Sequence, residues 1–188
     1  MQTYWYLENG KYYFLGANGS VRTGWQNIWG KWYYFDSDGV MQTGWQKIKG
    51  VWYYFGGASD GAMKTGWQKV WGKWYYLAEN GEMQSGWQKI SGKWYYFGGK
   101  NDGAKKTYWQ QIRGKYYWLG RNGAMRDGWQ RVWGKWYYLG SSGDGSMKSG
   151  WQRVSGKWYY LGKSSDGVMK TGWQTINKKK YYFYSDGS

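Results

Sequence analysis

The chain has 188 residues, a formal net charge of +16 and 24% aromatic residues, among them 19 Trp and 22 Tyr. It contains no His and no Cys, which excludes disulfides, Cys–His or Ser–His–Asp nucleophilic sites and the usual zinc ligands. Asp and Glu total only 11, mostly at expected turns, so a glycosidase-type pair of carboxylates is not expected either. No run of about 18 apolar residues could span a membrane. We therefore expect a binding protein without cofactor or metal, and not an enzyme.

One short motif is repeated from end to end, which is typical of a repeat array. The first Trp of each copy follows the previous one by 20 or 22 residues. No linker separates the copies, so we predict a single array over residues 1–188 with about nine repeats. The copies begin near Trp5, Trp25, Trp45, Trp67, Trp87, Trp109, Trp129, Trp151 and Trp173.

Each copy predicts two short strands and two turns. In the second copy, residues 25–28 and 31–35 form the strands, because the second segment is rich in residues that favour β-structure. Gly30 supplies the positive φ of a tight hairpin turn between them. Asp38-Gly39 marks a second turn, which leads into the next copy. Copies differ in length only before this second turn, where a loop tolerates insertion.

Strand alternation assigns the side chains of this hairpin to two faces. With the turn at residues 29–30, Trp25 lies opposite Tyr34, so Trp25, Trp32 and Tyr34 share one face. Tyr33 and Phe35 lie on the other face, where we expect them to pack between successive hairpins. A lone hairpin is marginally stable in water, so each copy must stack on its neighbours. The sequence thus predicts an all-β fold without helices, a β-solenoid of stacked hairpins with no central core.

The placement of Trp indicates a binding function beyond core packing. Core positions usually vary among apolar residues of similar volume, whereas most copies keep two Trp residues seven positions apart, such as Trp25 and Trp32. Two rings on one face, joined by a third from the next hairpin, would form an aromatic cage. Such cages recognise quaternary ammonium groups through the electron-rich ring faces.

The segments "TGWQKVWGKWYYL" and "DGAMKTGW" resemble the choline-binding repeats of cell-wall hydrolases and surface proteins of Gram-positive bacteria and their phages. The resemblance covers essentially the whole chain and rests on several spaced residues. It implies a left-handed β-solenoid that binds choline or phosphocholine on teichoic or lipoteichoic acids without catalysis. It also implies a secreted protein held at the cell wall, with its export signal outside this sequence.

The family's usual site combines the Trp of Gly-Trp, the first aromatic of Trp-Tyr-Tyr in the same hairpin, and the third aromatic of that triplet in the next hairpin. Carried onto this chain, the resemblance implies choline-binding sites at Trp25, Trp32 and Tyr54; Trp45, Trp52 and Tyr76; Trp67, Trp74 and Tyr96; Trp87, Trp94 and Trp118; Trp129, Trp136 and Tyr160; and Trp151, Trp158 and Tyr182. Methionines of the connecting segments are further candidates, namely Met41, Met63, Met83, Met147 and Met169.

Several copies depart from this pattern. Two sites have Tyr where Trp is usual and are expected to be weaker, namely Trp5, Tyr12 and Tyr34, and Trp109, Tyr116 and Tyr138. At the site of Trp87 and Trp94, Lys105 is expected to replace the methionine. In the last copy Lys180 stands where a Trp is usual and would repel a cationic ligand. We expect that copy to be a cap or the contact of a homodimer.

The positive charge leaves other partners open. A basic chain attracts polyanions, and interleaved aromatic and basic residues could bind nucleic acid. The lysines are spread evenly and form no cluster, so we do not expect nucleic acid to be the partner. Glucan-binding repeats use similar "GWQ" and "YYF" segments, so a polysaccharide-binding module is an alternative. An engineered repeat scaffold without a ligand is another.

Overall fold

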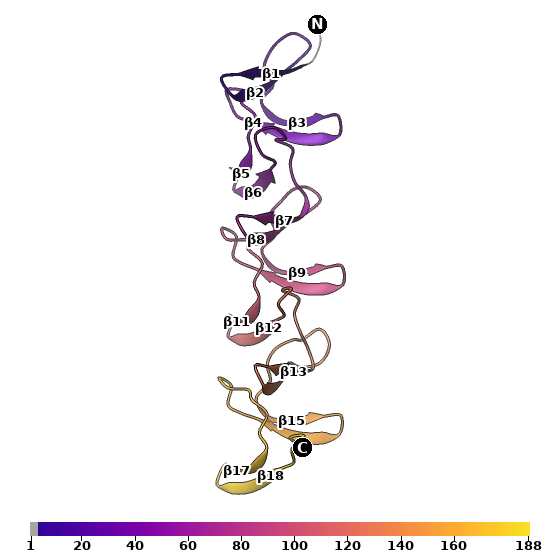
Figure 1. The fold of residues 1–188 in the computed structure, drawn as a ribbon, viewed down its shortest axis with the longest axis vertical. Helices are drawn as coiled ribbons and strands as arrows, with labels where there is room; N and C mark the ends of the chain where they lie inside the picture. Colours follow the sequence, from indigo (N-terminus) through magenta and orange to yellow (C-terminus); the bar gives the residue numbers. More distant parts are fainter. Residues whose placement is uncertain (1–3) are drawn as a thin grey trace. The chain divides into compact units, whose positions relative to one another are not determined.

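The computed structural model describes residues 4–188, and all regular structure in that part of the chain is β-strand, as predicted (Figure 1). The strands are β1 (Tyr4–Glu8), β2 (Lys11–Leu15), β3 (Gly24–Ile28), β4 (Lys31–Phe35), β5 (Gly44–Ile48), β6 (Val51–Phe55), β7 (Gly66–Val70), β8 (Lys73–Leu77), β9 (Gly86–Ile90), β10 (Lys93–Phe97), β11 (Tyr108–Ile112), β12 (Lys115–Leu119), β13 (Trp129–Val132), β14 (Lys135–Tyr138), β15 (Gly150–Val154), β16 (Lys157–Leu161), β17 (Gly172–Ile176) and β18 (Lys179–Phe183).

Successive strands pair two by two into antiparallel hairpins, one for each repeat. In the hairpin of β3 and β4, Trp25 lies opposite Tyr34 and Ile28 opposite Lys31, which confirms the predicted register. The turn between them has φ of 51° at Trp29 and 81° at Gly30. Two consecutive positive φ angles are typical of the type I′ turn, whose twist matches that of the flanking strands. Gly30 takes this conformation without steric cost.

Connecting segments join each hairpin to the one before it. After β4, the backbone N–H of Met41 donates to the carbonyl of Tyr12 in the preceding hairpin, at 2.8 Å. The next N–H, of Gln42, donates to the carbonyl of Tyr34 in its own hairpin, at 2.7 Å. The connection therefore satisfies backbone groups that a lone hairpin would leave at its edge. The same pattern recurs along the chain, so the hairpins follow one another as rungs of a β-solenoid.

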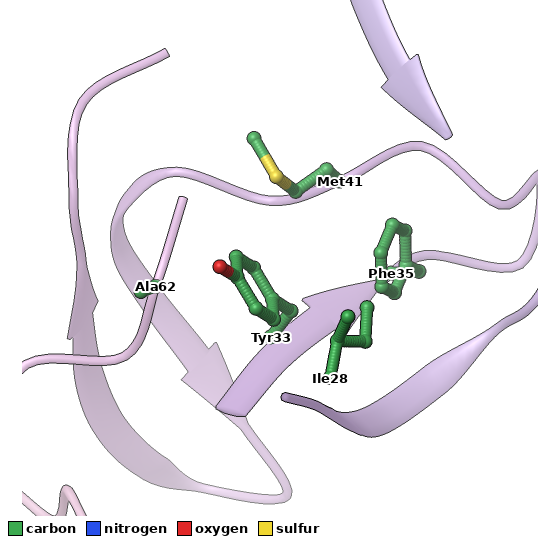
Figure 2. Close-up of a cluster of buried hydrophobic side chains, with 5 residues drawn as sticks. All are labelled: Ile28, Tyr33, Phe35, Met41 and Ala62. Atoms are coloured by element: carbon green, nitrogen blue, oxygen red, sulfur yellow. The ribbon is translucent and has the colours of Figure 1, made fainter. Parts of the chain in front are cut away.

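Burial is greatest at the apolar residue at the end of the second strand, or directly after it, in most hairpins, although Leu15 of the first hairpin is only partly buried. Phe35 is 0% exposed, and the same is true of Phe55, Leu77, Phe97, Leu119, Leu139 and Leu161. Figure 2 shows Phe35 beside Ile28 and Tyr33, with Met41 of the connection lying over Tyr33. Tyr33 and Phe35 thus pack between hairpins, as predicted. Similar clusters form around Val70 and Tyr75 and around Val132, Tyr137 and Leu139.

The chain divides into two compact units. The first contains the described residues up to Gly86 together with Phe97–Lys105, and the second contains Trp87–Tyr96 and Lys106–Ser188. The repeat motif runs through both units. The prediction of a single array over residues 1–188 stays a prediction, and residues 1–3 lie outside the described part.

Candidate functional site: aromatic cages between hairpins

Two indole rings stand on the same face of most hairpins. The ring centroids of Trp25 and Trp32 lie 6.3 Å apart at an interplanar angle of 82°. This edge-to-face arrangement is favourable for aromatic pairs, and it leaves part of each ring face open. Trp32 keeps 43% of its surface exposed. The pairing recurs at Trp45–Trp52, Trp67–Trp74, Trp87–Trp94 and Trp151–Trp158, with centroid distances of 6.3–6.4 Å.

A tyrosine of the following hairpin adds the third wall. The ring of Tyr53 on β6 lies 4.9 Å from that of Trp25 at 71°. Together these side chains border a pocket of about 460 Å³, whose lining residues are Trp25, Trp32, Tyr53, Met63, Glu79 and Asn80. A pocket of this kind could surround a compact cationic group with electron-rich faces.

The structure brings Trp25 and Trp32 together as expected, but the third ring is Tyr53 and not Tyr54. Tyr54 lies directly opposite Trp45 in its own hairpin, with ring centroids 5.0 Å apart. The two Tyr residues are adjacent on one strand, so they point to opposite faces. The face that carries Trp45 and Tyr54 meets the next hairpin, and only the opposite face can reach back to Trp25.

The same one-residue difference recurs in other copies. The expected third rings instead pair with the Gly-Trp indole of their own hairpins, at Tyr34, Tyr96, Tyr76, Trp118, Tyr138, Tyr160 and Tyr182. The rings that approach the preceding Gly-Trp indole are Tyr33, Tyr75, Tyr117, Tyr137, Tyr159 and Tyr181, at 4.8–5.0 Å.

Methionines of the connections close the pockets. The N–H of Met63 donates to the carbonyl of Trp32, at 2.7 Å, which places its side chain at the Trp25 pocket. Equivalent bonds hold Met41, Met83, Met147 and Met169 beside the second ring of their sites. Met125, which the sequence interpretation omitted, bonds to the carbonyl of Trp94 and lines the Trp87 pocket. Lys105 was expected in that pocket, but its N–H bonds to the carbonyl of Trp74, one repeat earlier.

Glycines of the second turns leave room for these methionines. Gly61 has φ of 56°, and a Cβ atom there would overlap the side chain of Met41. The glycine is therefore required for its backbone conformation and for the close approach of the thioether. The sequence predicted a turn at this position, but the contact with methionine could not be predicted because it depends on a separate repeat.

Acidic side chains lie at the rims of several pockets. Asp60 borders the pocket of Trp5, Asp144 borders that of Trp87, and Asp186 borders that of Trp129. Hydrogen bonds from the backbone and hydroxyl of Ser188 and from Lys157 lower the pKa of Asp186 to about 2. This carboxylate is therefore ionised at neutral pH.

Hydrogen bonding also keeps the side chain of Asp144 ionised at the rim of the Trp87 pocket. Burial alone would raise the pKa of Asp144, but hydrogen bonds from Lys148 and Ser146 outweigh it and hold the pKa below its usual range. Burial raises the pKa of Tyr117, a wall of the same pocket, so its phenol stays neutral. Each of the three rim carboxylates is paired with a lysine, namely Lys64, Lys148 and Lys157, so an ion pair borders each of these pockets.

The atypical copies form smaller or altered pockets. Trp5 and Tyr12 border a pocket of about 160 Å³ with Tyr33 and Met41. The ring of Trp109 contacts Tyr137, while the Tyr116 carbonyl accepts the N–H of Met147. In the last copy Trp173 is 72% exposed and lines a pocket with Lys180. The role of that copy as a cap or dimer contact stays a prediction.

Two further properties of the described part of the chain concern metal centres and membrane-spanning helices. Residues 4–188 contain no cluster of three or more carboxylate, imidazole or thiol groups arranged to hold a metal ion. Nor does this part form a helix with the length and apolar character needed to cross a membrane.

Family models of cell-wall and choline-binding repeats match most of the chain. The choline-binding repeat model matches residues 22–65 and 64–109, and a cell wall binding repeat model matches residues 107–125, 127–144, 149–169 and 171–188. No curated protein sequence matches the chain.

Solved structures of similar proteins cover nearly the whole chain. Choline binding protein F of Streptococcus pneumoniae, crystallised in the presence of a peptidoglycan analogue, is 33% identical with a TM-score of 0.73, over 98% of this chain and 85% of that one. CbpJ of Streptococcus pneumoniae TIGR4 is 29% identical with a TM-score of 0.71, over 99% and 93%. With hairpin repeats, recurrent aromatic clusters and these matches in agreement, the chain belongs to the choline-binding repeat family of cell wall binding proteins.

Proposed function

We propose that the chain is a non-catalytic, multivalent receptor for choline groups carried by cell-wall polymers, and that each open cage holds one trimethylammonium head. The observation that carries the proposal is the pocket walled by Trp25, Trp32 and Tyr53 with Met63. Three aromatic rings and a thioether offer an apolar, electron-rich surface that suits a methylated ammonium. A primary ammonium would lose more hydration on entry.

The strongest candidate sites share two Trp, one Tyr and one Met. Four cages have this composition: Trp25, Trp32, Tyr53 and Met63; Trp45, Trp52, Tyr75 and Met83; Trp87, Trp94, Tyr117 and Met125; and Trp129, Trp136, Tyr159 and Met169. Other sites contain Tyr in place of Trp or lack the methionine, namely Trp5, Tyr12 and Tyr33; Trp109, Tyr116 and Tyr137; and Trp151, Trp158 and Tyr181.

Rim carboxylates reduce the conflict between a charge of +16 and a cationic ligand, although Asp60, Asp144 and Asp186 are each paired with a lysine. Asp60, Asp144 and Asp186, and Glu79 at the Trp25 pocket, lie where a bound cation would enter. The nearest charges dominate the local field, because exposed charges beyond about 10 Å are screened at 0.1 M salt. The distributed lysines then suit the phosphates of a phosphocholine-bearing teichoic or lipoteichoic acid.

Valency compensates for weak individual sites. One cation–π contact contributes about 0.5–2 kcal/mol, so three contacts less ordering costs give a Kd near the millimolar range. Several such sites facing one polymer can raise the overall affinity by about 10²–10⁴. Repetition of the site therefore provides tight attachment to a choline-bearing surface. Such attachment is consistent with a secreted protein held at the cell wall.

Calorimetric titration with choline tests the proposal. We expect saturable binding with a millimolar Kd and a stoichiometry of at least four, and we expect free choline to elute the protein from an immobilised quaternary amine. Ethanolamine, which lacks the methyl groups, serves as the matched control ligand and should bind far more weakly. Absence of heat with choline, or equal binding of ethanolamine, would overturn the proposal. Selective retention by an α-glucan would favour the polysaccharide alternative.

A further inference from the structure

Lys105 occupies the place that methionine takes in most other connections. Its backbone N–H donates to the carbonyl of Trp74, at 2.7 Å, as that of Met63 does to Trp32. A bridge to Phe97 fixes the segment on the other side, as Phe55 does for Met63. The side chain of Lys105 is therefore delivered to the Trp67–Trp74 pair in the way that a methionine is delivered elsewhere.

The ammonium of Lys105 lies over both indoles of this pair. Its Nζ is 5.4 Å from the ring centroid of Trp67 and 5.8 Å from that of Trp74. Both distances fall within the range of about 6 Å for cation–π attraction. The two rings are 6.3 Å apart at 84°, which is the arrangement of the open cages. Lys105 has not distorted the pair, and it places a cation where a ligand cation would bind.

A second lysine of the chain provides a useful contrast. Lys47 approaches only one indole, that of Trp52, at 5.8 Å, from the facing position on the neighbouring strand. It also donates to Asn101, at 3.5 Å, and it is exposed. Lys105, by comparison, is partly buried, and burial lowers the pKa of its ammonium. Only Lys105 lies over both rings of a cage among the described cation–π contacts.

We propose that Lys105 is a built-in ligand that closes the Trp67–Trp74 cage to quaternary ammonium groups. The inference rests on the proposed function of the open cages. It adds that the Trp67–Trp74 cage is not available to choline. A tethered cation has an effective concentration in the millimolar range or above, which competes with a ligand of millimolar Kd. Two cations in one cage would also repel each other. Lys105 thereby fastens its connection to the hairpin of β7 and β8 at the cost of one binding site.

Substitution of Lys105→Met tests this assignment, because methionine is the residue that the chain itself uses at the equivalent position. We expect calorimetry to show one additional choline per chain, with the other sites unchanged. Trp74→Ala should leave the stoichiometry of the wild type unaltered and abolish the site gained in Lys105→Met. Lys100→Met, which removes the same charge from an exposed position of the same connection, is the matched control and should add no site.

Nuclear magnetic resonance provides a readout that does not depend on choline. The Hε protons of Lys105, assigned by their loss in Lys105→Met, should lie upfield of those of other lysines because of the two indole ring currents. They should return to the common position in Trp74→Ala, and choline should not move them in the wild type. Unshifted protons, or protons that choline displaces, would overturn the inference. If the wild type binds choline but Lys105→Met gains no site, the inference fails while the proposed function stands.

Discussion

Replacement of Phe55 by Ala is expected to lower the free energy of unfolding by about 3–5 kcal/mol, the largest loss of stability that a single substitution should cause. Phe55 ends β6 with 0% exposure, and its ring centroid lies 5.6 Å from that of Trp25 in the preceding hairpin. Truncation would leave a cavity between two hairpins. Because each hairpin packs only on its neighbours, no larger core could rearrange to fill that cavity. Denaturation with guanidinium, followed by Trp fluorescence, measures the effect.

Phe55→Leu is the matched control, since Leu77 occupies the equivalent position with the same burial. A volume-related apolar exchange should cost less than about 1.5 kcal/mol. Because Phe55 also supports Trp25, the alanine variant should lose affinity at that cage. Equal stabilities for the alanine and leucine variants would show that packing between rungs does not hold the fold together.

Trp136→Ala is expected to have the largest effect on binding, the loss of one choline site per chain. Trp136 is 42% exposed and lines the pocket of about 340 Å³ that also contains Trp129, Tyr159 and Met169. Removal of a half-exposed wall should spare most of the packing while it deletes a cation–π contact of about 0.5–2 kcal/mol, or roughly 2–30-fold in affinity. Calorimetry should show one site fewer or one site greatly weakened.

The same hairpin offers a control for this variant. Trp133 lies in the turn with 76% exposure and φ of 48°, away from the pocket lining. Trp133→Asn removes an exposed indole and introduces a residue that readily adopts positive φ. Its stoichiometry should match the wild type, while loss of the edge contact between Trp133 and Trp118, whose ring centroids lie 5.4 Å apart, should lower stability slightly. If both variants bind choline as the wild type does, the cage on this hairpin is assigned wrongly.

Most of the fold follows from local sequence. The register of β3 and β4 and the two faces of their hairpin could be predicted because turn chemistry and strand alternation act within a few residues. The pairing of Trp25 with Trp32 on one face followed from the same rule. The burial of Tyr33 and Phe35 followed from the need of an isolated hairpin to stack.

The parts that sequence reasoning missed all depend on contact between repeats. Alternation shows that Tyr53 and Tyr54 point in opposite directions, but it does not show which face meets the preceding hairpin. The assignment of Lys105 to the Trp87 cage, and the omission of Met125, came from placing a connection one repeat too late. The sequence spacing that separates Trp32 from Met63 also separates Trp74 from Lys105, so this spacing would have assigned Lys105 to the Trp67–Trp74 cage.

A crystal structure of the protein with choline tests the central claim most directly. We predict trimethylammonium density within about 6 Å of the ring centroids in the cages of Trp25, Trp32 and Tyr53 and of Trp129, Trp136 and Tyr159, with none between Trp67 and Trp74. Choline bound only outside these cages, or cages filled by the protein's own side chains throughout, would contradict it.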